Sequence, residues 1–180
     1  MKKIKPLKNV FYSAGIVLSL SLIAAGAAAA APDKPPCSAS AESRQLDFWL
    51  GDWAVAAPGG TKTSASKVFL ELDQCLLVES WDGGRGHTGK NMFAYSADDK
   101  SWHGLFADNE GRVHVFEGKV SAGAAEFTGP SRSETGAAVL NRIRVIRINA
   151  DQVEQTWEKS IDNGATWSVV FRGVYSRKKS

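Results

Sequence analysis

The chain has 180 residues, of which 22 are Lys or Arg and 19 are Asp or Glu, and its formal net charge is +3. This length fits one domain with an appendage. A content of 43% hydrophobic and 23% charged residues is typical of a globular protein and excludes wholesale disorder. A basic net charge is also found in proteins that bind nucleic acid or anionic membranes, so the position of the charges matters.

Residues 1–31 have the three parts of a secretory signal peptide. Four lysines between Lys2 and Lys8 precede an apolar run from Val10 to about Ala31, which ends in small residues. This order predicts export and cleavage. An uncleaved membrane anchor is the alternative, because the run is just long enough to span a bilayer. We expect a secreted or periplasmic protein with no stable membrane association after cleavage.

Cleavage also changes the charge of the chain. It takes away four of the 22 basic residues and none of the 19 acidic ones, which leaves a net charge of about −1. The remaining chain has no basic stripe that alternates with aromatic residues, so we expect no nucleic-acid partner. The sequence leaves the oligomeric state open.

The mature chain keeps two cysteines, Cys37 and Cys75. In an exported protein an even number of cysteines indicates a disulfide. Metal ligation is the poorer alternative, because two cysteines this far apart with no nearby histidine lack the spacing of a metal site.

Residues 32–40 predict a linker, and residues 41–50 predict a short N-terminal helix. From Gly51 on, short β-branched and aromatic runs alternate with turn residues, which is typical of strands. We expect strands near residues 52–57, 63–72, 75–81, 89–96, 101–107, 112–120, 124–129, 138–148, 152–159 and 166–176. The fold prediction for residues 41–178 is therefore all-β, a single antiparallel up-and-down barrel of about ten strands, because closure removes exposed edges. A β-sandwich is the alternative.

Gly51 and Trp53 stand at the start of the first predicted strand. Their G-x-W spacing resembles a signature of the calycin superfamily, which includes lipocalins and fatty-acid-binding proteins. In that superfamily the tryptophan packs under a basic side chain of the last strand. Here Arg172 and Arg177 are the candidates, since an indole face attracts a guanidinium. The resemblance implies a structural role for all four residues.

A second motif lies near the end of the chain, where Ser160, Asp162, Gly164 and Trp167 have the spacing S-x-D-x-G-x-x-W. It resembles the Asp-box hairpin of sialidase propellers. A propeller repeats this box, whereas the sequence has one copy and is too short for a propeller. We therefore interpret the motif as a structural hairpin.

Alternating positions on the predicted strands bring polar and aromatic residues together. If they point into the barrel, they can form a ligand site. The candidates for the wall of the lumen are Trp81, Trp102, Trp157 and Tyr175, and the candidates for groups that orient a ligand are Glu79 and Arg144. In the alternative, Arg142, Arg144, Glu154 and Glu158 form ion pairs on the outer face.

The sequence has no recognisable catalytic motif, which favours a non-catalytic role. His103 and His114 lie on neighbouring predicted strands and are weak candidates for a metal or haem ligand. His87 lies in a glycine-rich loop, where we expect it to be exposed to solvent.

From about Cys37 to Lys178 the chain resembles a family of exported bacterial domains of unknown function with a calycin-like barrel. The resemblance rests on residues 46–53, on Cys75-x-x-x-Glu79-x-Trp81, on Trp102 with Asp108-x-x-Gly111, on residues 158–167 and on Tyr175. It implies the fold, an exported location and a Cys37–Cys75 link, but no activity.

Three functions are compatible with these observations. The leading hypothesis is non-catalytic binding of a small, partly apolar ligand in the barrel lumen, without a cofactor. The second is a nitrobindin-like haem protein or enzyme that uses His103 or His114. The third is a structural or interaction domain whose core is filled by side chains.

Overall fold

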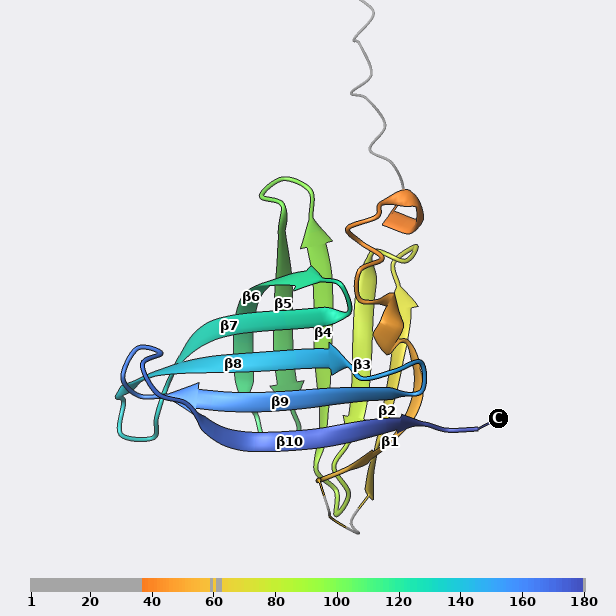
Figure 1. The fold of residues 1–180 in the computed structure, drawn as a ribbon. Coiled ribbons are helices and arrows are strands. Elements are labelled where there is room, and N and C mark those ends of the chain that lie inside the picture. The colour runs from red at the N-terminus through yellow and green to blue at the C-terminus, as the bar shows by residue number, and fades with distance from the viewer. Residues whose placement is uncertain (1–36, 59, 61–62, 180) are drawn as a thin grey trace, which may run out of the picture. The chain divides into compact units, whose positions relative to one another are not determined.

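The structure, a computed structural model, describes residues 37–58, 60 and 63–179 (Figure 1). The predicted signal peptide, residues 1–31, and residues 32–36 of the predicted linker lie outside the described residues. The rest of that linker is ordered, because Cys37–Ala39 forms a 3-10 helix. In the described part of the chain, no helix is both long enough and apolar enough to span a bilayer.

Ten antiparallel strands close into one barrel, in which each strand pairs with its neighbours in sequence and β1 pairs with β10. The strands are β1 (Gly51–Ala56), β2 (Thr63–Glu71), β3 (Leu76–Asp82), β4 (Thr88–Ser96), β5 (Ser101–Asp108), β6 (Val113–Ser121), β7 (Ala124–Arg132), β8 (Ala138–Arg147), β9 (Gln152–Ser160) and β10 (Ser168–Arg177). The up-and-down barrel is confirmed, and the β-sandwich is excluded. Every predicted strand end lies within three residues of the observed one.

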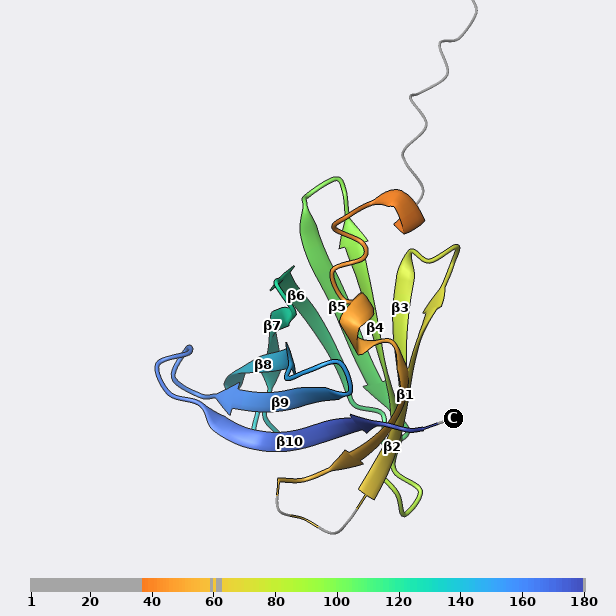
Figure 2. The ribbon, with the colours of Figure 1, turned by 45° about the vertical axis from the view of Figure 1, so that its right-hand side comes forward.

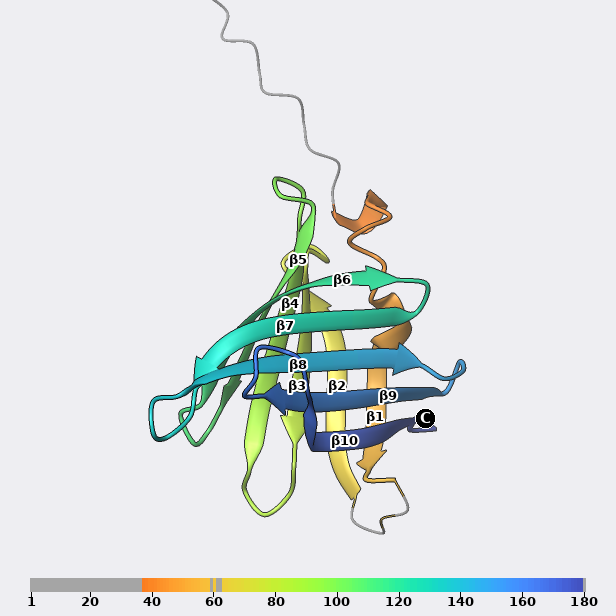
Figure 3. The ribbon, with the colours of Figure 1, turned by 60° about the vertical axis from the view of Figure 1, so that its left-hand side comes forward.

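The barrel has two sides whose strands cross. β7 to β10 run across β2 to β5 in the views of Figures 1 and 3, and β6 bends from one side to the other. Twisted strands that tilt against the barrel axis give this arrangement. It brings the end of β9 and the start of β10 toward the loops that follow β3 and β5.

The lumen is lined by every second residue of each strand. On β8, the side chains of Asn141, Ile143 and Val145 are buried, whereas Arg142 and Arg144 alternate with them on the outer face. This alternation follows from the pleat of a strand. It decides which residues can reach a ligand in the barrel.

The segment before β1 closes one end of the barrel. Its second 3-10 helix, Asp47–Trp49, replaces the longer helix expected over residues 41–50. Leu46 and Trp49 are both 0% exposed, and a single 3-10 turn places these two side chains, three residues apart, on one side of the segment. Trp49 packs against Phe93 and Tyr175 with ring centroids 6.1 and 6.0 Å apart. Figure 2 shows the segment beside the upper parts of β3 to β5.

Trp53 of β1 lies under an arginine of the last strand, as the G-x-W resemblance implies. The guanidinium carbon of Arg177 is 4.3 Å from the ring centroid of Trp53, and Arg177 Nη1 donates to Leu50 O at 2.9 Å. A Cβ on Gly51 would overlap this guanidinium, and Gly51 has a φ of +136°. A glycine is therefore required here. The other candidate, Arg172, pairs instead with Glu154 at 2.9 Å.

Replacing Arg177 by methionine is expected to lower the free energy of unfolding by about 1–2 kcal/mol, because a cation–π contact and a hydrogen bond are lost. Arg172→Met is the matched control on the same strand. It removes only an exposed ion pair, which contributes at most about 1 kcal/mol. Urea denaturation of both variants tests the assignment, and equal losses would contradict it.

The predicted disulfide is confirmed. Cys37 and Cys75 are bonded, and they are 38 positions apart in the sequence. The bond joins the first 3-10 helix to the β2–β3 turn, in which Leu72, Asp73 and Gln74 have φ values of 50°, 51° and 70°. Three successive left-handed residues without glycine are costly, so this turn depends on its contacts.

The loop between β9 and β10 has the hydrogen bonds of a closed hairpin. Ser160 Oγ donates to Asp162 Oδ1 at 2.7 Å and accepts from the Gly164 amide at 2.8 Å. The hydroxyl and the amide of Thr166 both donate to Asp162, at 2.6 and 2.9 Å, and lower the pKa of this carboxyl to about 2. Trp167 packs on the outer face, 3.9 Å from the guanidinium carbon of Arg142. All of these contacts hold the loop to itself or to β8, as expected for a structural hairpin.

Candidate ligand-binding site

A cavity of about 240 Å³ lies at the end of the barrel away from the N-terminal segment. Six of its lining residues are aromatic or apolar: Trp81, Phe106, His114, Trp157, Val170 and Phe171. The others are polar or charged: Glu79, His87, Asn91, Arg112, Gln155 and Lys159. They come from β3, the β3–β4 loop, β4, β5, β6, β9 and β10 and from the β5–β6 turn. The cavity is smaller than the roughly 300–1,000 Å³ typical of sites for drug-sized ligands.

Two groups of aromatic rings form the walls. Trp157 stands edge-on to Phe106 and to His114, with centroid distances of 4.9 and 5.0 Å. Trp81 stands edge-on to Phe171 at 6.0 Å. The register of the strands explains the first group, since Phe106 pairs with His114 across β5 and β6. Such walls favour a flat or apolar ligand.

The polar floor of the cavity is centred on Glu79, which is 0% exposed. One of its oxygens accepts from Ser66 Oγ at 2.8 Å, and the other accepts from Asn91 Nδ2 at 2.7 Å. Tyr175 OH lies 2.9 Å from the first oxygen and 2.5 Å from Gln155 Oε1. The described residues place no arginine or lysine in an ion pair with this carboxyl group.

Burial favours the neutral form of Glu79. The hydroxyl of Tyr175 has one proton, yet its oxygen lies within hydrogen-bond distance of both Glu79 Oε1 and Gln155 Oε1. Tyr175 is a donor within reach of both oxygens, and a protonated Glu79 is one arrangement that satisfies all three groups. Burial raises the pKa of Glu79 above its usual value, although hydrogen bonds from Ser66 and its neighbours oppose the rise. Burial also raises the pKa of Tyr175, and the adjacent Glu79 raises it further, so the hydroxyl stays protonated.

His114 is a neutral part of the wall. Burial lowers its pKa, and the positive charges of Lys159 and Arg112 lower it further. Its Nδ1 atom is buried, and no hydrogen-bond partner is found for it within the described part of the chain. The same holds for Trp81 Nε1 and Asn91 Oδ1. Buried polar atoms without partners are costly, so a ligand with a polar group can stabilise this end of the barrel.

The rim contains a cluster of charged groups around Arg112. This guanidinium contacts Asp108 Oδ2 at 2.6 Å, Glu110 Oε2 at 2.8 Å and His87 Nε2 at 2.9 Å. Hydrogen bonds from Arg112 and from His87 lower the pKa of Asp108 to about 2, although burial opposes this. His87, Asp108 and Glu110 are close enough together to hold a metal ion. The Arg112 guanidinium, however, already supplies a positive charge between these groups. We interpret the cluster as structural.

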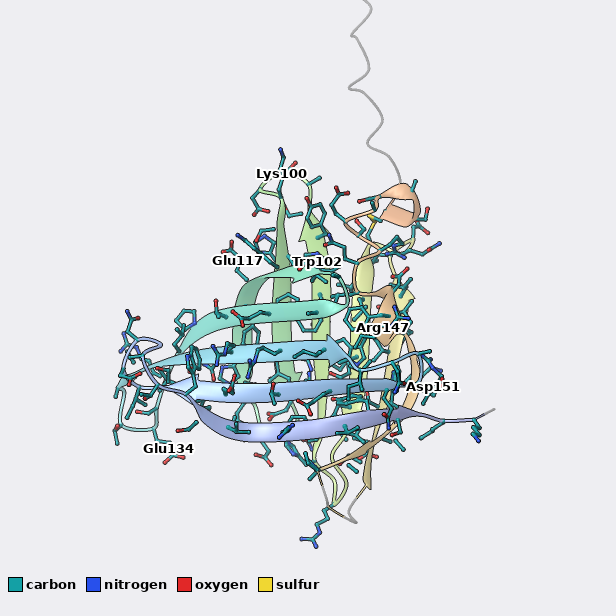
Figure 4. The ribbon with its side chains drawn as sticks, viewed as in Figure 1. Lys100, Trp102, Glu117, Glu134, Arg147 and Asp151 are labelled. Atoms are coloured by element: carbon teal, nitrogen blue, oxygen red, sulfur yellow. A yellow bond between two sulfur atoms is a disulfide. The ribbon has the colours of Figure 1, made fainter. Side chains whose placement is uncertain are left out.

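Four of the six predicted ligand-binding residues lie at this site. Glu79, Trp81 and Trp157 line the cavity, and Tyr175 supports the floor through its hydroxyl group. Trp102 also points inward, but it lies toward the β4–β5 turn that carries Lys100 (Figure 4). Its Nε1 donates to Gln45 Oε1 at 3.1 Å, so it belongs to the closed end of the barrel.

The expectation that Arg144 points into the lumen is corrected. Ile143 and Val145 take the inward positions of β8, so Arg144 lies on the outer face, where it contacts Glu158 at 3.1 Å. Arg142 contacts the same carboxylate at 2.8 Å. The outer-face ion pairs that the sequence offered as an alternative are therefore present.

The two predicted haem-ligand candidates lie on opposite faces of the sheet. His103 is exposed on the outer face and contacts Asp99 at 2.8 Å, whereas His114 lines the cavity. His87, for which we expected exposure, is half-buried, and its ring stands edge-on to Trp81 at 5.1 Å. His87 is half-buried because the β3–β4 loop folds over the cavity.

Most of the remaining lining residues carry a weak signal in the sequence. Gln155, Trp157 and Lys159 alternate along one predicted strand, which indicates a common face. Nothing in the sequence indicates which face is the inner one, or that Val170 and Phe171 both reach the cavity. The register of β10 shifts between Val169 and Phe171, and this irregularity brings two adjacent residues to the lining.

Two comparisons with known proteins, by family model and by curated sequence, give no match. The functional argument therefore rests on the residues of the barrel itself.

Proposed function

We propose that this protein is an exported β-barrel that binds a small, partly apolar ligand in the open end of its lumen. One observation carries the proposal: side chains fill one end of the barrel, while the other end keeps a cavity of about 240 Å³. Trp81, Phe106, Trp157 and Phe171 line this cavity, and its floor is polar. Apolar walls with a few fixed polar groups are typical of small-molecule sites.

Two features support an exported location. The sequence predicts a signal peptide at residues 1–31, and the Cys37–Cys75 disulfide is compatible with an oxidising compartment. The resemblance to exported domains with calycin-like barrels agrees with this location. Beyond the ligand we propose no macromolecular partner.

The size of the cavity disfavours the haem alternative. Of the two candidate ligands, only His114 faces the lumen, and its ring is held between Phe106 and Trp157. A haem is larger than the drug-sized molecules that need about 300–1,000 Å³, and this cavity is smaller than that range. The residues present therefore do not fit a haem, and a single-ring or short-chain ligand fits the space better.

A bulky side chain at the mouth tests the proposal. Val170 lines the cavity and is 52% exposed, whereas the adjacent Val169 is 56% exposed and does not line it. Val170→Trp is expected to weaken binding of a small ligand at least about tenfold, equivalent to about 1.4 kcal/mol, and Val169→Trp to leave it unchanged. Either substitution falls on the surface, so we expect both variants to fold.

Native mass spectrometry of protein purified from the exported fraction gives the readout. The expected result is a small molecule that the wild type and Val169→Trp retain and that Val170→Trp loses. A chain that retains nothing, and whose thermal stability no single-ring or short-chain compound changes, would favour the structural domain instead.

A further inference from the structure

The cavity has a charge asymmetry that its size and apolar walls do not explain. Three of its lining residues are ionisable as acids or strong bases: Glu79, Arg112 and Lys159. Burial of Glu79 at the floor disfavours its charged form. Asp108 and Glu110, the carboxylates nearest the rim, are not part of the lining. The charged lining groups at the mouth, Arg112 and Lys159, are therefore both positive.

Of the two cations, Arg112 and Lys159, only Lys159 is available to bind an anion. Arg112 is held by Asp108 and Glu110 and contacts His87. Lys159, by contrast, has no ion-pair partner among residues 37–58, 60 and 63–179. A lysine ammonium is strongly hydrated, so an unpaired one at an apolar opening attracts anions.

The position of Lys159 follows from the strand pattern. Val153, Gln155, Trp157 and Lys159 alternate along β9 on the side that faces the lumen, and Lys159 lies near the end of this strand. It pairs across the sheet with Asn141 of β8 and with Ser168 of β10. Its side chain is exposed, so the ammonium lies at the mouth and not at the floor.

We infer that the ligand is an amphipathic anion, such as a small aromatic carboxylate, whose charged group binds Lys159 at the mouth while its apolar body packs between Trp157, Phe106 and Trp81. This inference rests on the proposed function and adds the chemical class and the orientation of the ligand. The floor fits the buried end of such a molecule, because Ser66, Asn91 and Tyr175 already hold the Glu79 carboxyl group.

Two probes of equal shape test the charge. Phenylacetate is ionised at neutral pH, whereas phenylacetamide is neutral. Quenching of tryptophan fluorescence, or calorimetry, gives the affinity of each for the folded protein. We expect phenylacetate to bind about three to ten times more tightly than the amide, as one charge-assisted contact at a half-open site provides.

Substitution of the lysine assigns the effect to one side chain. Lys159→Gln is expected to reduce phenylacetate affinity to that of the amide and to change amide binding much less. Lys67→Gln is the matched control, because Lys67 is exposed on β2 and does not line the cavity. Raised salt is expected to weaken binding of the anion and not of the amide.

The outcomes separate the two proposals. If both probes bind equally, the anion preference is wrong. If Lys159→Gln leaves phenylacetate binding unchanged, the assignment of the charged group to Lys159 is wrong. In both cases the cavity still functions as a binding site. If neither probe binds to the wild type, and no neutral compound of similar size does, the proposed function is wrong as well.

Discussion

Replacing Cys37 and Cys75 by serine is expected to lower the free energy of unfolding by about 2–4 kcal/mol. The bond closes a loop over 38 positions, for which the chain-entropy model gives about 4 kcal/mol. It also anchors the segment that carries Leu46 and Trp49 into the barrel. In addition, it holds the end of a turn with three left-handed residues.

Urea denaturation of the double serine variant measures this effect. Wild-type protein under reducing conditions is the matched control, because it lacks the bond but keeps both cysteines, and it should unfold at the same denaturant concentration as the variant. Binding of a ligand at the opposite end of the barrel should survive at low temperature. A loss below about 0.5 kcal/mol would mean that packing of Trp49 alone holds the segment.

Replacing Glu79 by alanine is expected to lower the free energy of unfolding by about 3–5 kcal/mol. The change removes the acceptor of Ser66 and of Asn91 and the partner of Tyr175, and it opens a cavity in a fully buried site. Glu79→Gln is the conservative control. Its amide nitrogen can donate to Tyr175 and to Ser66 while its oxygen accepts from Asn91, which keeps the three contacts of the acid, so we expect little loss at low pH.

The pH dependence of stability tests whether Glu79 is protonated. Its pKa in the folded protein is raised, so the folded state binds the proton more tightly than the unfolded state does. The stabilisation is fully present below the pKa of the unfolded state and is lost as the pH rises through the pKa of the folded state. The wild type should therefore become less stable relative to Glu79→Gln as the pH rises above about 4, the usual pKa of a glutamate.

This comparison isolates one group. Asp108 and Asp162 have lowered pKa values, so they act in the opposite direction, and their stabilisation is lost as the pH falls toward about 2. Both remain in Glu79→Gln, and their contribution cancels in the difference. Urea denaturation across the pH range gives this difference, and a constant value would show that Glu79 is ionised in the folded state.

The strands and the barrel are predictable from local patterns. β-Branched and aromatic runs mark each strand, and clusters such as Asp162-Asn163-Gly164 mark the turns, because these residues tolerate or require the backbone of a turn. Closure then follows from the number of strands, since an open meander of this length leaves two unpaired edges. Cys37 and Cys75 were likewise predictable as a pair, because the chain has no other cysteine.

The site was only partly predictable. Trp81 and Trp157 were expected at the wall, and Glu79 among the orienting groups. Arg144 was placed in the lumen because a strand shows two faces and the sequence does not indicate which one is inside; a shift of one residue exchanges them.

By itself, the sequence determined the strand order, the barrel class, the disulfide pair and the predicted export signal, because each depends on residue types at short spacing or on a count. The tertiary structure alone decided that Lys159 and His114 face one cavity, that Arg144 and His103 face outward, and that Trp102 belongs to the closed end. The face on which a side chain lies depends on the register of its strand. That register is set by the closure of all ten strands together around residues such as Trp49 and Glu79.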